Sequence, residues 1–247
     1  MKVAYVDMIG GAAGDMLMGA WVDAGLDARE LERGLRSVVA DGWELVIERV
    51  ERAGVRATYL DLYIPGEDDH AHGPGGHHHH RAHHGYRLND VLAIVARSKL
   101  PARAIERASA IYRRLAEAEA RARGADAETM FFHDVGQIDA ILDVAGTCFA
   151  LEHFGIDALH ISAFPIGHGI SHGHPNPGPA ALELMRGFGL RKLDVEAELV
   201  TETGAAILST LATPGTPPEM TLERTGYGAG RKSFDFPNVV RIMIGSF

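Results

Sequence analysis

The chain opens with a pattern that predicts a strand, a glycine turn and a helix. Residues 3–6 are apolar and end at Asp7, which is typical of a short buried strand. Three glycines, Gly10, Gly11 and Gly14, follow closely, and apolar residues at 17, 18, 21 and 22 then recur with helical spacing. We therefore expect the backbone to turn tightly between a first strand and a first helix.

Alternating and helical patterns interleave along the rest of the chain. Alternation predicts a strand pair over residues 44–50 and 55–64. Helical periodicity marks residues 31–39, 88–95, 101–124, 138–154 and the stretches that begin near 180 and 204, and further strands are predicted at 159–162, 220–225 and 239–245. This mixture indicates a mixed α/β (α+β) class, with a mixed sheet flanked by helices. The length suits a single domain, residues 1–247.

A second glycine-rich segment, residues 226–230, lies between the last two predicted strands. We interpret it as a hairpin turn. The alternative is that Gly228 and its neighbours let a ligand approach the backbone closely, because glycine has no Cβ atom.

Histidine is concentrated in one stretch: eight of the 14 histidines fall between residues 70 and 84. Residues 66–86 contain almost nothing that could be buried, so we expect a flexible, disordered loop. Neutral imidazole binds borderline divalent metals such as Cu²⁺, Ni²⁺ and Zn²⁺. The predicted metal ligands of this loop are His70, His72, His77, His78, His79, His80, His83 and His84. Metal capture or storage is favoured over a low-complexity insertion that binds metal only in the test tube.

Charge and cysteine content exclude several classes of protein. The net charge of −9 argues against a general nucleic-acid binder, which needs clustered Lys and Arg. The single cysteine, Cys148, allows neither an intramolecular disulfide nor a cysteine-based zinc site, and we expect it in the core. No apolar run reaches the ~20 residues of a membrane span, and the first residues do not resemble a signal peptide. We expect a cytoplasmic protein.

A second candidate site comprises His133, Asp134, Asp139 and Asp143. The last two are four residues apart and share one face of a predicted helix, where like charges repel unless a cation or donor lies between them. The two residues before the helix could complete a metal site. The alternative is that the aspartates only stabilise the helix N-terminus. The residues alone favour neither interpretation.

The glycine turn is a third candidate site. Backbone N–H groups at Gly10, Gly11 and Gly14 could bind an anion at the helix N-terminus, whereas Asp7 and Asp15 could bind a cation. Taken alone, a tight turn without ligand is the more economical interpretation.

Two further segments carry candidate ligands. His168, His172 and His174 lie in a Pro/Gly-rich loop and could bind metal. Thr201, Thr203 and Gly204 begin a predicted helix, which Thr203 is expected to cap, and suit a phosphate or carboxylate.

Taken together, these motifs resemble the LarC family of nickel insertion proteins over nearly the whole chain. The resemblance is carried by the order of five segments: residues 7–16, the His-rich loop, residues 133–143, residues 199–206 and residues 226–230. Two positions depart from the family pattern. Phe131-Phe132-His133-Asp134 stands where the family commonly has His-x-His-Glu, and Glu202 stands where it usually has proline.

The resemblance implies CTP-dependent insertion of nickel into pyridinium-3,5-bisthiocarboxylic acid mononucleotide, which yields the nickel-pincer cofactor of lactate racemase and related enzymes. It implies that Ni²⁺ is captured by the histidines, that His133, Asp134, Asp139 and Asp143 act in metal transfer or proton removal, and that the cofactor-binding residues are Asp7, Gly10, Gly11, Gly14, Asp15, Thr201, Thr203, Gly204 and Gly228. The chain matches the nickel-binding half of the family. CTP, with Mg²⁺ or Mn²⁺, would bind a C-terminal companion polypeptide or domain.

Two other functions stay open on the residues alone. One is a nickel metallochaperone or storage protein without catalytic activity. The other is a Mg²⁺-dependent phosphohydrolase that uses the Asp7/Asp15 or Asp139/Asp143 carboxylates.

Overall fold

The computed structural model describes residues 1–65, 86–132, 134–171 and 173–247. Most of the predicted His-rich loop (66–86) lies outside this set, including the eight histidines from His70 to His84, and so do His133 and His172. The disorder of the loop and its metal ligands therefore stay predictions.

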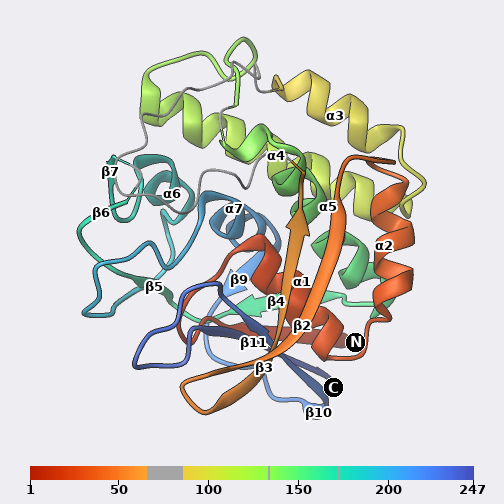
Figure 1. The fold of residues 1–247 in the computed structure, drawn as a ribbon, viewed down its shortest axis with the longest axis vertical. Coiled ribbons are helices and arrows are strands. Elements are labelled where there is room, and N and C mark those ends of the chain that lie inside the picture. The colour runs from red at the N-terminus through yellow and green to blue at the C-terminus, as the bar shows by residue number, and fades with distance from the viewer. Residues whose placement is uncertain (66–85, 133, 172) are drawn as a thin grey trace.

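A mixed sheet of seven strands organises the described residues (Figure 1). In spatial order its strands are β2 (Glu44–Arg52), β3 (Val55–Tyr63), β10 (Thr221–Ala229), β11 (Val239–Ser246), β1 (Lys2–Asp7), β4 (Ala158–Ile161) and β9 (Ala212–Pro214). β1 pairs antiparallel with β11 and parallel with β4. Two small two-stranded sheets pair β5 (Phe164–Ile166) with β8 (Leu190–Lys192), and β6 (Ile170–Ser171) with β7 (His174–Pro175). The mixed α/β class and the predicted strand pair are thereby confirmed.

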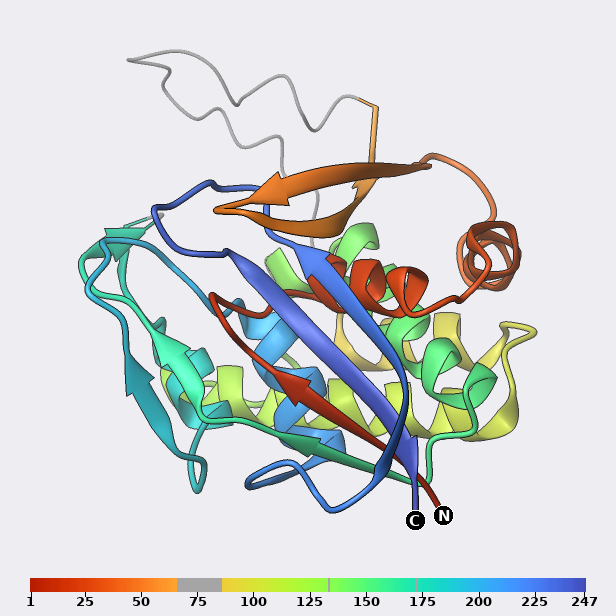
Figure 2. The ribbon, with the colours of Figure 1, turned by 90° about the horizontal axis from the view of Figure 1, so that it is seen from below.

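Helices cover one side of the large sheet, as Figure 2 shows. They are α1 (Gly14–Asp23), α2 (Ala28–Arg36), α3 (Leu88–Ala96), α4 (Ala102–Arg123), α5 (Ile138–His153), α6 (Pro179–Leu184) and α7 (Glu202–Leu211), with a single 3₁₀ turn, η2 (Asp134–Gly136), before α5. The side chains that β1 and β11 direct at the helices, such as Val6 and Ile242, are fully buried. Cys148 is also buried, as predicted.

The helix α1 packs so closely on β10 that glycine is required there. A Cβ atom at Gly228 would lie 1.7 Å from the carbonyl oxygen of Met16, and one at Gly226 would lie 2.1 Å from that of Ala20. The hairpin-turn interpretation of residues 226–230 is therefore wrong. These glycines continue the strand, since their missing side chains let a helix backbone approach the sheet.

The predicted cap of α7 is displaced by two residues. Thr201, not Thr203, is the N-cap: its hydroxyl accepts a hydrogen bond from the backbone N–H of Gly204 at 3.2 Å. Thr203 lies within the first turn and is buried. Sequence position alone did not distinguish the two threonines, because both precede the same apolar run.

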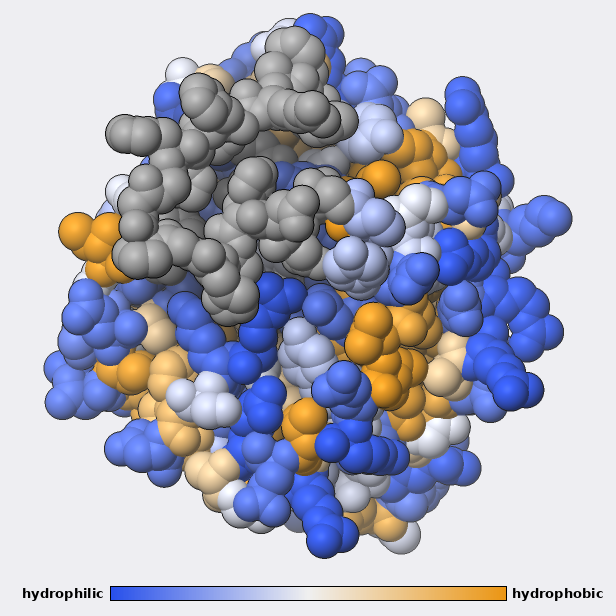
Figure 3. Space-filling model, in the orientation of Figure 1, coloured by the Kyte–Doolittle hydropathy of each residue, from blue (hydrophilic) through white to orange (hydrophobic). Residues whose placement is uncertain are grey.

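One face of the molecule carries apolar groups in separate patches. Figure 3 shows these patches divided by charged and polar side chains on the face of Figure 1. None of the described helices has the length and apolar character that a bilayer crossing demands.

Candidate functional site

Three segments that are distant in sequence meet at the turn between β1 and α1. The backbone of Ala12 bridges that of Val200: its N–H donates to Leu199 at 2.9 Å, and its carbonyl accepts from the N–H of Thr201 at 3.1 Å. A Cβ atom at Gly204 would lie 2.4 Å from the carbonyl of Ala12. The start of α7 is therefore held against the glycine turn.

The third segment is the first half of α5, which brings Asp143 to the first turn of α1. A Cβ atom at Gly14 would lie 2.3 Å from the Oδ2 atom of Asp143, so glycine makes room for this carboxylate. The carboxylate accepts a hydrogen bond from the backbone N–H of Asp15. Its Oδ1 atom is buried and has no hydrogen-bond partner among the described residues. A buried polar atom without a partner is costly, so this position calls for a proton or a ligand.

Two further carboxylates complete a group that we call the carboxylate cluster: Asp15, Asp139 and Asp143. Asp139 and Asp143 lie on α5, and the charge of Asp139 acts on both of the others. Asp15 lies in the first turn of α1 and accepts from the N–H of Met16 at 2.6 Å. The predicted common face of Asp139 and Asp143 therefore meets Asp15, which the sequence placed in a different candidate site.

Burial and mutual repulsion change the proton affinity of the cluster. Desolvation raises the pKa of Asp15 to about 6. The hydrogen bond from Met16 opposes this rise, and the nearby charge of Asp61 adds to it. Desolvation is also the main cause that raises the pKa of Asp143 well above its ordinary value, and the charges of Asp15 and Asp139 add to it. The carboxylates of Asp15 and Asp143 therefore keep a proton to higher pH than ordinary aspartates do.

A tyrosine closes the inner side of the cluster. Tyr112 of α4 is fully buried, and its hydroxyl donates to the carbonyl of Val135 at 3.3 Å. Burial raises the pKa of Tyr112 well above its ordinary value, and the charges of Asp143 and Asp139 raise it further. Tyr112 therefore stays neutral beside the carboxylates.

A group of three residues near the cluster was missed by sequence reasoning. Tyr59 and Asp61 lie on β3, and Arg231 follows β10. The Nε of Arg231 donates to the Tyr59 hydroxyl at 3.3 Å, and its Nη2 lies 3.2 Å from Asp61. The charges of Asp61 and Arg231 both act on Asp15. No local pattern could have joined them, since about 170 residues separate the partners.

Asp7, predicted beside Asp15, has a different partner. Its carboxylate accepts a charged hydrogen bond from Arg241 of β11 at 2.6 Å. Gly10 and Gly11 lie against backbone, with hypothetical Cβ atoms 2.3 Å from the carbonyls of Pro237 and Leu199. The structure thus keeps these two glycines at the turn for packing, and their role in binding stays a prediction.

The described histidines of the second histidine group lie at an exposed edge of the molecule. His168 has its Nε2 atom 3.4 Å from Asp194, and His174 is exposed on β7. Figures 1 and 2 both place β6 and β7 to the side, apart from α1. In the part of the chain that the structure describes, no group of three His, Cys, Asp or Glu side chains is placed to hold a metal ion. Asp134 begins η2, next to His133, which is outside the described residues.

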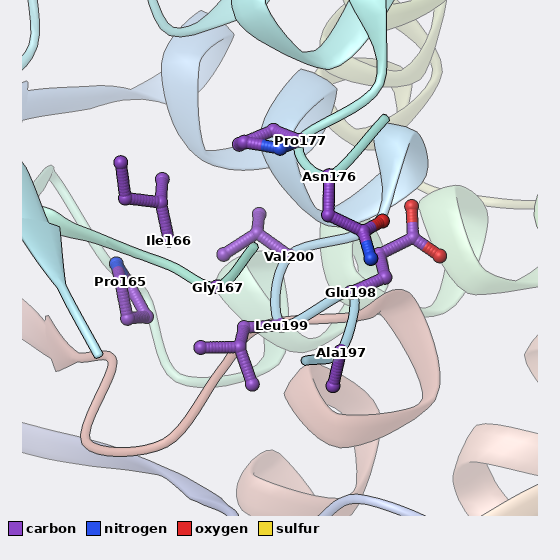
Figure 4. A pocket seen from close by; sticks show the side chains of 9 residues that line it. All are labelled: Pro165, Ile166, Gly167, Asn176, Pro177, Ala197, Glu198, Leu199 and Val200. Atoms are coloured by element: carbon purple, nitrogen blue, oxygen red, sulfur yellow. The ribbon is translucent and has the colours of Figure 1, made fainter. Parts of the chain in front are cut away.

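A shallow hollow lies beside the start of α7 (Figure 4). Its enclosed volume is close to 0 Å³, and it is lined by the end of β5, by Asn176 and Pro177, and by residues 197–200. This is less than the ~300–1,000 Å³ of a typical small-molecule pocket. The hollow is therefore too small to enclose a nucleotide in this structure.

Comparison with known proteins agrees with this arrangement of motifs. A family model described as nickel insertion protein matches residues 4–246. The pyridinium-3,5-bisthiocarboxylic acid mononucleotide nickel insertion protein of Desulfitobacterium hafniense is 40% identical over 99% of this chain, which covers 58% of that relative. The same-named protein of Staphylococcus epidermidis is 37% identical, and a putative nickel insertion protein of Myxococcus xanthus is 39% identical.

The chain spans about 60% of the length of these relatives. No solved structure matches it. Because the family model covers almost every residue, the chain belongs to the nickel insertion protein family.

Proposed function

We propose that this chain presents nickel to pyridinium-3,5-bisthiocarboxylic acid mononucleotide, the compound in the names of its relatives. The observation that carries the proposal is the meeting of Asp15, Asp139 and Asp143 beside the glycine turn and the start of α7. Nickel is the cargo of this reaction. The Gly10–Gly14 turn and residues 201–204 form the wall against which the mononucleotide binds.

Ligand chemistry explains why carboxylates suit the transfer step. Oxygen ligands are hard and prefer Mg²⁺, Ca²⁺ or Mn²⁺, whereas imidazole and sulfur ligands suit nickel better. Because the described residues form no complete metal cage, the cluster holds Ni²⁺ only together with donor atoms of the substrate. Passing the ion from carboxylate oxygen to the two sulfurs is then favourable.

The cluster also supplies a proton acceptor. Forming the nickel–carbon bond implied by the family resemblance breaks a ring C–H bond, and the proton must move to a base within hydrogen-bond reach. The Oδ1 atom of Asp143 is buried and without a partner among the described residues, and accepting that proton removes a buried negative charge, so we assign the proton to this position.

Nickel titration in the presence of substrate tests the proposal. Calorimetry with the wild-type chain should show a nickel site that appears only when the mononucleotide is present. D139N and D143N should each weaken that site by about tenfold or more, since a carboxylate ligand or neighbour is lost. D41N removes an exposed carboxylate and serves as the matched control. A substrate-dependent site that is unchanged in both cluster variants would contradict the proposal.

The His-rich loop is proposed to capture Ni²⁺ loosely before transfer. Deleting residues 70–84 should lower the number of nickel ions bound by the chain, because these residues hold eight of its 14 histidines. The substrate-dependent site should remain. If the number of nickel ions bound per chain is unchanged by the deletion, the loop does not capture nickel. The proposal for the carboxylate cluster is not affected by that result.

Completion of the reaction is proposed to need the part of the relatives that this chain does not span. The family resemblance assigns CTP, with Mg²⁺ or Mn²⁺, to that part. The complete assembly would be a cytoplasmic CTP-dependent cyclometallase, a lyase whose product serves a nickel-pincer-dependent racemase.

A further inference from the structure

A loop of β10 and β11 places a cation next to the carboxylate cluster. The N–H of Gly230 donates to the carbonyl of Asn238 at 2.9 Å and closes the loop. The far end of the loop packs on the glycine turn, since the N–H of Gly10 donates to Val239 at 3.1 Å. Arg231 is the first residue inside this closed loop. Figure 2 shows the loop and the β1–α1 turn on the same side of the molecule.

The guanidinium of Arg231 is fixed on one edge and open on the other. Its Nε donates to the Tyr59 hydroxyl and its Nη2 lies 3.2 Å from Asp61. No partner of its Nη1 is found among the residues that the structure describes, and the side chain is 65% exposed. A guanidinium held by Tyr59 and Asp61 is already oriented to bind an anion that approaches from solvent.

The negative charge around the Arg231 guanidinium suggests its role. Asp15, Asp139 and Asp61 surround the site with negative charge, and the positive charge that acts on Asp15 comes from Arg231. An anionic nucleotide that approaches the cluster is repelled by these carboxylates. A cation beside them is needed to admit it.

We propose that Arg231 binds the phosphate group of the mononucleotide, an inference that rests on the proposed function. The two thiocarboxylates must lie at the cluster, where nickel becomes bonded to sulfur. The phosphate is the remaining anionic group, and it belongs at the exposed edge where Nη1 points away from Asp61 and Tyr59. The alternative, an ion pair with Asp61 that only stabilises the fold, explains little, since exposed pairs contribute little to stability.

Other phosphate positions near the cluster are already engaged. The N–H of Asp15, at the start of α1, donates to Asp143. The Thr201 hydroxyl, at the start of α7, accepts from Gly204. Arg231, by contrast, can gain a charged partner through its Nη1 atom and keep its bonds to Tyr59 and Asp61.

The test compares binding of two ligands, the mononucleotide and the same compound without its phosphate. The wild-type chain should bind the mononucleotide about ten- to a hundredfold more tightly, the range expected for a charged hydrogen-bonded pair. R231Q should abolish this preference and leave the affinity for the phosphate-free compound unchanged. R231K should retain part of it. R56Q removes an exposed arginine from β3, the strand that carries Tyr59 and Asp61, and should behave as wild type.

Three results would overturn the assignment. The first is equal weakening of both ligands in R231Q, which would show a structural role. The second is a phosphate preference that R231Q retains. The third is a wild-type chain that binds both ligands alike or binds neither. The nickel titration separates this inference from the proposed function. If the substrate-dependent nickel site forms and depends on Asp143 while R231Q keeps the phosphate preference, only the role of Arg231 fails. If the phosphate preference depends on Arg231 but no such nickel site forms, only nickel transfer fails.

Discussion

At the scale of single residues, the site is governed by carboxylates that the fold forces together. Asp15 and Asp143 repel one another, and both lose hydration, so their protonated forms are favoured in the folded chain. Sequence spacing predicted the common face of Asp139 and Asp143. It could not predict that Asp61 and Arg231 lie near Asp15. The pairing of β3 with β10 brings them there, and sequence spacing carries no sign of that pairing.

The raised pKa of Asp15 makes the apo protein less stable as pH rises. The ordinary pKa of this group is 3.8, and folding raises it to about 6. The destabilisation is therefore absent below pH 4, grows between pH 4 and 6, and is complete above pH 6. D15N removes it, so the variant should be more stable than wild type by about 3 kcal/mol at pH 7 and equal to it at pH 3.5.

Denaturant unfolding of nickel-free protein at the two pH values measures this difference. D41N removes an exposed carboxylate and keeps Asp15, so its stability should match that of the wild type at both pH values. Equal or lower stability of D15N at pH 7 would refute the electrostatic description of the cluster.

Gly14 tests whether the position of Asp143 matters for binding. In G14A the new Cβ atom would lie 2.3 Å from Oδ2 of Asp143, so the carboxylate must move. Alanine favours a helix over glycine by about 1 kcal/mol, which offsets part of the strain. We expect a folded protein whose substrate-dependent nickel affinity falls by about tenfold, measured by calorimetry. Wild-type affinity in a folded G14A would show that the carboxylate is not needed at this position.

At the scale of elements, hydrophobic periodicity was sufficient to predict the fold class but not the closest contacts. The strand–turn–helix opening was predicted because β1 is a short apolar run, buried on both faces, and the β2–β3 pair because apolar and polar residues alternate along both strands. Residues 226–230 were misread, because glycine is typical of turns. The packing of α1 on β10 instead requires glycine within a strand, and that contact links residues about 210 positions apart.

A substitution at Gly228 should therefore disrupt the contact between α1 and β10. In G228A the Cβ atom would lie 1.7 Å from the carbonyl oxygen of Met16. Relieving this clash requires a shift of the α1 or β10 backbone, which is costly in a packed core. We expect a loss of about 3 kcal/mol or more in unfolding free energy, by thermal or denaturant unfolding.

Gly215 provides the matched control for this position. A Cβ atom there meets nothing within 4 Å, so G215A should unfold as the wild type does. Similar stability of G228A and G215A would contradict the close approach of α1 to β10.

At the scale of the whole molecule, the chain brings together parts that its sequence shows only separately. The glycine turn, the α5 aspartates and the start of α7 lie in one place because β1 lies inside the sheet, between β11 and β4, and α1, α5 and α7 cover the same side of it. Such convergence depends on topology, which spacing along the chain does not encode. The chain spans about 60% of the length of the relatives that it matches.

Formation of the nickel-bonded mononucleotide tests the central claim most directly. The wild-type chain would be combined with the remaining part of a relative, Ni²⁺, CTP and the mononucleotide, and product would be followed by mass spectrometry. We predict product with the wild type and with D41N, and at least a hundredfold less with D143N, which binds the companion part normally. Undiminished product from D143N would contradict the account.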